Sequence, residues 1–159
     1  MSDVRGQYEG LGGWLILVGI GIVVTPIRTA AELLPIYVPI FTDGTFQYVT
    51  TPGTEAYHPL WAVIILSEVC INALLFLGGV YLIYLFFRKR EFFPRLFIYL
   101  AVFGFVFVFV DAMSIKIVLP SEPIFDTPTI TELAKSGATV FIWVPYMLVS
   151  ERVKATFTR

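Results

Sequence analysis

Apolar residues dominate four long stretches of the chain, and polar residues gather between them. The stretches cover residues about 13–34, 60–87, 95–119 and 130–149. Each is at least as long as the roughly 20 residues that a helix needs to cross a bilayer. The pattern therefore predicts an all-α fold, a single bundle of four transmembrane helices.

Alternating phenylalanines in the third stretch make a membrane β-barrel the main alternative fold. Phe103, Phe105, Phe107 and Phe109 alternate with period two. The strands of a barrel, however, alternate apolar with polar residues. Here both faces are apolar along most of the stretch, so helices are the better interpretation.

The segment after the first stretch has the pattern of a β-hairpin. In IYVPIFTDGTFQYVTT, the pair Asp43-Gly44 separates two runs that are rich in β-branched and aromatic residues. Asp-Gly favours the two-residue turn of a hairpin, and Pro39 would make the first run an edge strand. We therefore expect a small extracytoplasmic hairpin in the loop 35–59, which docks a partner or a second copy. Its aromatic side chains should pack on the helix bundle or on the partner. They are Tyr37, Phe41, Phe46 and Tyr48.

Local signals refine the predicted helices. Thr129 and Glu132 have the spacing of a capping box, which predicts the start of the fourth helix. Pro26 should kink the outer half of the first helix. Small residues in and before the first helix offer close approach to neighbouring helices. They are Gly12, Gly13, Gly19 and Gly21.

The first apolar stretch differs from a secretory signal peptide. Its leader, MSDVRGQYEGLGG, has one arginine against two acidic residues, and no small-x-small cleavage site directly follows the stretch. A retained first helix is therefore the better interpretation, with a cleaved signal as the alternative.

Basic residues lie on one side of the predicted topology. They occur in the loop 88–95 and in the tail 150–159, whereas the loops 35–59 and 120–131 contain acidic residues and no lysine or arginine. The basic residues are Arg88, Lys89, Arg90, Arg95, Arg152, Lys154 and Arg159. Because basic loops stay on the cytoplasmic side, we expect both termini in the cytoplasm.

Composition supports a membrane protein and narrows the possible chemistry. Hydrophobic residues make up 57% of the chain and charged residues 14%, against about 25% charged in soluble domains. Cys70 and His58 are the only cysteine and histidine, which excludes an internal disulfide, a thiolate metal cluster and two-histidine haem ligation. The net charge of −1 gives no bias toward nucleic acid. We expect the lipid bilayer as the surroundings and no metal, cofactor or nucleic-acid partner.

Each predicted helix carries an ionisable side chain at a similar depth. At about 1.5 Å per residue from the outer helix ends, Glu68 and Asp111 lie roughly 12 Å deep, Arg28 roughly 9 Å and Lys135 roughly 8 Å. Asn72 follows Glu68 by one helical turn. Since isolated charges at this depth cost several kcal/mol, we expect these side chains to face inward, with acids of two helices paired to bases of the other two.

Two interpretations of this polar cluster remain open. An ion-pair clasp would hold the helices together. An outward-opening pocket would instead bind a small molecule, an ion or a lipid headgroup, and Glu68 could then exchange a proton. No metal-ligand set, redox pair or nucleophile–base couple supports an enzyme. The leading expectation is a non-enzymatic accessory or interaction protein, and the alternative is a small transporter or ligand-binding protein.

Three stretches of the chain share the pattern of a known family. They are GLGGWLILVGIG, RKREFFPRLFI and IWVPYMLVSERVKATF. Together they resemble the YdgK-like family of small bacterial inner-membrane proteins, which is catalogued as a domain of unknown function. The resemblance spans nearly the whole chain and implies four transmembrane helices and no established activity. It also matches Glu68 and Asn72 to polar positions of the second helix, and Lys135-Ser136 to a basic–serine pair that opens the fourth.

Overall fold

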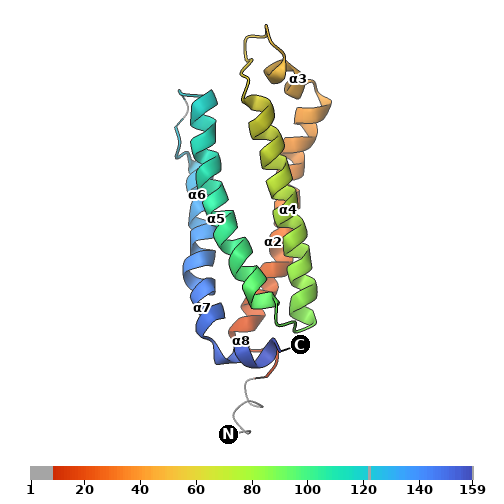
Figure 1. Ribbon diagram of the computed structural model, residues 1–159, viewed down its shortest axis with the longest axis vertical. Helices are drawn as coiled ribbons and strands as arrows, with labels where there is room; N and C mark the ends of the chain where they lie inside the picture. The colour runs from red at the N-terminus through yellow and green to blue at the C-terminus, as the bar shows by residue number, and fades with distance from the viewer. Residues whose placement is uncertain (1–8, 122, 159) are drawn as a thin grey trace.

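The computed structural model describes residues 9–121 and 123–158, and every regular element in this part of the chain is a helix (Figure 1). Three of the described helices are long and apolar enough to cross a membrane: α2 (Trp14–Thr42), α4 (Trp61–Phe87) and α5 (Phe93–Val118). They correspond to the first three apolar stretches of the sequence. The chain is therefore a membrane protein with three candidate spans in its described residues.

Parts of the sequence-based predictions fall outside the described residues. These parts are residues 1–8 of the leader, Glu122 of the acidic loop and Arg159 of the basic tail. The other charged residues of the same loops lie within the described part, which therefore shows the same charge asymmetry.

The predicted fourth transmembrane helix over 130–149 is wrong, and with it the four-helix transmembrane bundle. The chain there is divided into α6 (Thr127–Ala138), the π-helical turn η1 (Thr139–Trp143) and α7 (Val144–Val149). Of these, α6 has 12 residues, too few to cross a bilayer. Pro145 has no N–H to give to the carbonyl one turn earlier, and a π-helical turn before it is one way for a helix to accommodate the missing bond.

The predicted β-hairpin in the loop 35–59 is also wrong, because both of its arms are helical. The first arm forms the last turns of α2, which ends at Thr42 and not near residue 34. The second arm forms α3 (Thr45–Thr50). Between them Gly44 is left-handed, with φ 89° and ψ 0°, a conformation that glycine adopts at helix junctions as readily as in hairpin turns.

Aspartates fix the starts of two of these helices. Asp43 Oδ1 accepts a hydrogen bond from the Thr45 N–H (2.9 Å), and Asp126 Oδ1 accepts one from the Thr129 N–H (2.8 Å). Hydrogen bonds from these threonines hold the pKa of both aspartates below the ordinary value. The predicted capping box is therefore wrong, since α6 starts one turn earlier with Asp126 as its cap and Glu132 contacts other groups.

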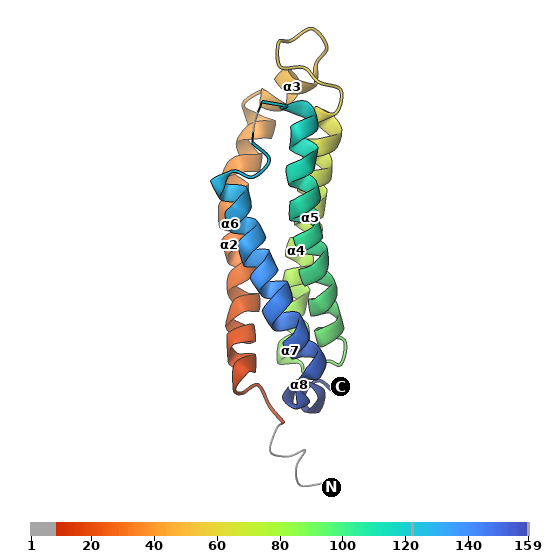
Figure 2. The ribbon, with the colours of Figure 1, turned by 90° about the vertical axis from the view of Figure 1, so that its left-hand side faces the viewer.

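The helices form two antiparallel pairs that diverge toward one end of the molecule. α2 packs on α4, α4 on α5, and α5 on α6 and α7. Figure 1 shows the α2–α4 pair and the α5–α6 pair close together at the end near α8 (Glu151–Thr156) and apart at the end that carries α3. In Figure 2, α8 lies across the closed end, below α7. We call this end the base.

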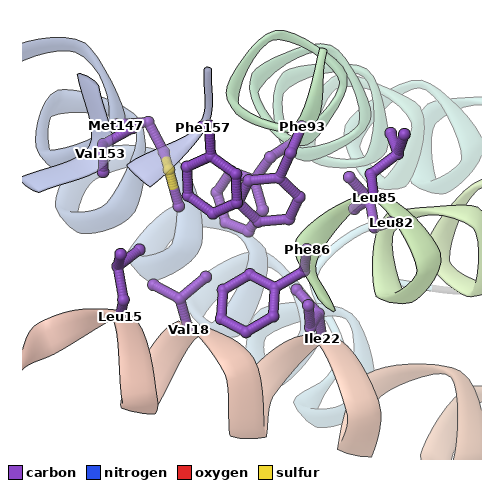
Figure 3. Packing of buried hydrophobic residues seen from close by; sticks show 11 residues of the cluster. Leu15, Val18, Ile22, Leu82, Leu85, Phe86, Phe93, Met147, Val153 and Phe157 are labelled. Carbon is purple, nitrogen blue, oxygen red and sulfur yellow. The ribbon is translucent and has the colours of Figure 1, made fainter. Parts of the chain in front are cut away.

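The buried core lies at the base, where aromatic rings from three segments meet (Figure 3). Phe93 of α5 is 0% exposed, and its ring stacks on that of Phe157 with centroids 4.5 Å apart. Phe86 of α4 meets Phe93 edge to face at 5.2 Å. Other members are aliphatic or thioether side chains around these rings, together with Phe97. They are Leu15, Val18, Ile22, Leu82, Leu85, Met147 and Val153. Burial and ring contacts both stabilise this cluster.

Hydrogen bonds attach α8 to the segment before α2. The Thr156 hydroxyl accepts from the Gly10 N–H (3.1 Å) and donates to the Gly10 carbonyl (3.2 Å). Thr156 is 1% exposed, so these bonds form away from solvent. Ser150 caps α8 by accepting from the Val153 N–H (3.4 Å). The base is thus closed by a short helix that both polar and apolar contacts hold in place.

Glycines of α2 differ in how closely they approach a neighbour. A Cβ atom at Gly19 would lie 3.0 Å from the ring of Phe86, whereas one at Gly21 would have no atom within 4 Å. The predicted close approach is therefore confirmed at Gly19 and wrong at Gly21. The two glycines before the helix lie against the guanidinium group of Arg152. They are Gly12 and Gly13.

Candidate functional site

A cavity of about 790 Å³ lies between α2, α4, α5 and α6. Its volume is within the roughly 300–1,000 Å³ of small-molecule pockets. All five residues of the predicted polar cluster line it. They are Arg28, Glu68, Asn72, Asp111 and Lys135. The five predicted residues therefore border one cavity, although the ion pairs that they form differ from the predicted ones.

The lining of the cavity is polar toward the α3 end and apolar toward the base. Its ionisable residues come from α2 at or beyond its midpoint, from the first half of α4, from the second half of α5, and from α6 with its N-cap residue. They are Arg28, Glu32, Glu68, Asp111, Asp126, Glu132 and Lys135. The lining nearer the base consists mainly of apolar side chains and glycines, including Ile22, Gly79, Leu82, Phe97, Leu100 and Gly104. The cavity thus has two ends of different chemistry.

Tyr37, which the sequence assigned to the hairpin and not to the polar cluster, joins α2 to the polar residues of α4. The Tyr37 hydroxyl donates to Glu68 Oε1 (2.8 Å) and accepts from Asn72 Nδ2 (3.0 Å). Asn72 Nδ2 also donates to the backbone carbonyl of Glu68 (3.0 Å). The predicted helical spacing of Glu68 and Asn72 on one face is confirmed. Their partner is a neutral hydroxyl and not a basic residue.

Tyr37 was missed because it had been assigned to the predicted hairpin. Pro35 and Pro39 lie on either side of Tyr37, and each proline removes one helical hydrogen bond. Prolines are nevertheless tolerated in membrane helices, where neighbouring groups compensate for the lost bond. Continuing the helical spacing from the cavity-lining residues Thr29 and Leu33 would have brought Tyr37 onto the same face.

Replacing Tyr37 with phenylalanine should weaken the contact between α2 and α4. The change leaves the ring in place and removes one donor and one acceptor, so we expect a loss of about 1–2 kcal/mol of stability. Thermal unfolding in detergent measures this loss. Tyr99→Phe is the control, since its ring is 65% exposed. An equal effect of the two substitutions would contradict the role of the hydroxyl.

The two basic residues of the cluster share one acidic partner. Lys135 Nζ lies 2.7 Å from Glu132 Oε1, within α6. Arg28 Nη1 lies 3.8 Å from the same oxygen and so links α2 with α6. Arg28 Nε also lies 3.9 Å from Glu32 Oε1, one turn further along α2. Each cation therefore has a carboxylate on its own helix, three or four residues away, and Arg28 has a second one on α6.

The predicted pairing of Glu68 and Asp111 with Arg28 and Lys135 is not found in the part of the chain that the structure describes. No lysine or arginine within residues 9–121 and 123–158 forms an ion pair with either of the two acids. Both acids are half-buried and line the cavity. Among the same described residues, no group of three or more His, Cys, Asp or Glu side chains could hold a metal ion.

Fold and cavity together define an α-helical membrane protein with a cavity that is lined by charged residues at one end and by apolar residues at the other. A family model with the description "Protein of unknown function (DUF2569)" matches residues 8–158. The chain belongs to this family. No curated protein and no solved structure matches it.

Proposed function

We propose that this chain is a non-enzymatic membrane protein that binds a small ligand in the cavity between α2, α4, α5 and α6. The observation that carries the proposal is the 790 Å³ space around which the charged and polar residues are arranged. A clasp would bring Glu68 and Asp111 into contact with the basic residues. Instead, these two acids border a volume that is large enough for a ligand.

The accessory role that the sequence favoured has less support. It relied on a hairpin in the loop 35–59 as a docking surface, and this loop contains helical turns in place of strands. Docking of a partner or a second copy through the loop stays a prediction. The ligand-binding alternative gains support from the cavity.

We further propose that the protein lies in a bacterial inner membrane with its base toward the cytoplasm. Arg88, Lys89 and Arg90 follow α4 at the base, and Arg152 and Lys154 belong to α8 at the same end (Figure 1). The positive-inside rule supports a cytoplasmic base, and the resemblance to the YdgK-like family supports the bacterial inner membrane. The polar end of the cavity would then face the extracytoplasmic side.

Cysteine accessibility tests whether water reaches the cavity. In a Cys70→Ala background, Ala112→Cys introduces a thiol into the cavity lining next to Asp111. A membrane-impermeant thiol reagent added from outside should label it rapidly, because reaction requires a hydrated thiolate. The control is Phe109→Cys, at a position on the same helix that is 45% exposed and does not belong to the cavity lining.

We expect Ala112→Cys to react at least about tenfold faster than Phe109→Cys, since only the cavity thiol would have access to water. The folded state of each variant is checked by its thermal unfolding. Equal protection of both thiols in folded protein would mean a dry clasp and would contradict the proposal.

A further inference from the structure

The charges that line the cavity are unbalanced. The lining includes two basic residues, Arg28 and Lys135, and more than twice as many acidic residues. The acidic residues are Glu32, Glu68, Asp111, Asp126 and Glu132. Since the bases are outnumbered, a ligand that carries a positive charge suits this end of the cavity better than an anion.

Three of the five acidic residues already have partners in the described structure. Glu32 contacts Arg28, and Glu132 contacts both cationic groups. The carboxylate of Asp126 accepts a backbone N–H at the start of α6. A ligand would have to compete with these contacts, so they are not the main source of recognition.

The remaining two acids, Glu68 and Asp111, come from neighbouring helices. Glu68 receives a hydrogen bond from the Tyr37 hydroxyl, which is a neutral group and brings no positive charge to the carboxylate. α4 and α5 pack on each other but lie apart toward the α3 end (Figure 1), and both carboxylates line the cavity there. A half-buried carboxylate without a cation is costly. An ammonium group, which has three N–H donors and a positive charge, suits such a pair of acceptors.

The opposite end of the cavity suits an apolar chain. Leu82, Phe97 and Leu100 contribute to its lining, and Cβ atoms at Gly21 and Gly104 would meet no atom within 4 Å. This open space continues from the acidic end toward the core at the base. Transfer of a hydrocarbon chain from water into this end of the cavity would be favourable, because apolar surface is removed from water.

We infer that the ligand is a single-chain amphiphile whose ammonium head lies at Glu68 and Asp111 and whose apolar chain extends toward Leu82 and Leu100. The inference rests on the proposed ligand-binding function and adds the chemical class of the ligand. It does not depend on how the ligand enters, and it requires no covalent step.

Quenching of Trp143 measures binding of such a ligand directly, since Trp143 belongs to the lining nearer the base. Trp14→Phe/Trp61→Phe leaves it as the only tryptophan. The protein is placed in nanodiscs of phosphatidylcholine and titrated with chain-brominated dodecylamine, dodecanol or dodecanoate. Only the head group differs among these probes. We expect saturable quenching in which dodecylamine binds about tenfold or more tightly than dodecanol, and dodecanoate binds more weakly than either.

Charge-neutral variants locate the source of this preference. Glu68→Gln/Asp111→Asn should lower the preference for the amine over the alcohol to about one while dodecanol still binds, which also shows that the variant is folded. Glu55→Gln/Glu91→Gln removes two carboxylates at exposed positions outside the lining and should keep the preference.

The outcomes separate the inference from the proposed function. Equal binding of amine and alcohol by the parent protein, or tighter binding of dodecanoate, would overturn the cationic ligand class and leave a ligand-binding cavity in place. A preference that survives the double substitution at Glu68 and Asp111 would overturn their role. If no probe gives saturable quenching, the inference is contradicted. If, in addition, the Ala112→Cys thiol is protected, the proposed function is contradicted as well.

Discussion

Replacing Phe93 with alanine should lower the free energy of unfolding by about 3–5 kcal/mol, the usual cost of removing a large buried aromatic side chain. Phe93 is 0% exposed and is in ring contact with both Phe86 and Phe157. Its loss would leave a void among rigid rings that cannot easily collapse. Thermal or denaturant unfolding in detergent measures the change.

The neighbouring phenylalanine provides a matched control for this substitution. Phe92 has the same side chain and directly precedes α5, but it is 44% exposed. Phe92→Ala should therefore cost less than about 1 kcal/mol. Similar losses for Phe92→Ala and Phe93→Ala would show that the aromatic cluster at the base is not what stabilises the fold.

Replacing Gly19 with leucine should destabilise the protein by about 2–3 kcal/mol through overpacking. A Cβ atom alone would lie 3.0 Å from the Phe86 ring, and Phe86 is 2% exposed, so the ring has little room to move. Leucine adds three further carbon atoms in the same direction. The gain in helix propensity, up to about 1 kcal/mol over glycine, offsets only part of this cost.

Gly21→Leu separates overpacking from the general effect of changing a glycine. Gly21 belongs to the same helix, and a Cβ atom there meets nothing within 4 Å. Unfolding of this variant should occur at the same temperature as in the parent or slightly above it. If both leucines destabilise the protein equally, the close approach of Gly19 to α4 is not the cause.

The sequence predicted the three candidate spans well because apolar length is a strong and local signal. Bilayer thickness sets a minimum length for a helix, and the second and third stretches end within a few residues of the observed helices. The same signal failed for 130–149. Summed hydrophobicity does not register Pro145 or the π-helical turn beside it, and these divide the helix.

The hairpin prediction failed because its signals have two structural meanings. Asp43-Gly44 supplies a left-handed residue, which suits a tight turn between strands and also a junction between helices. Pro35 and Pro39 are unfavourable in most helices, yet both lie inside α2. Local residue preferences were therefore outweighed by the need of a long apolar segment to satisfy its backbone hydrogen bonds.

Depth along the helices was enough to predict the lining of the cavity, but not its contacts. Counting residues brought Arg28, Glu68, Asp111 and Lys135 to one level, and all four line one space. Which cation meets which carboxylate depends on helix rotation, and an apolar helix has no strong polar face to define it. Lys135 pairs with Glu132, three residues away on the same helix. The sequence predicts this pair only if ion pairs within a helix are considered before ion pairs between helices.

The contact of Phe157 with Phe86 and Phe93 has a consequence for the order of folding. Because the ribosome adds Phe157 some 60 residues after Phe93, the helices α2, α4 and α5 are made before the residue that completes their shared core exists. The base therefore stays open until residue 157 has been made, and a nascent chain halted before this residue should be a substrate for membrane proteases.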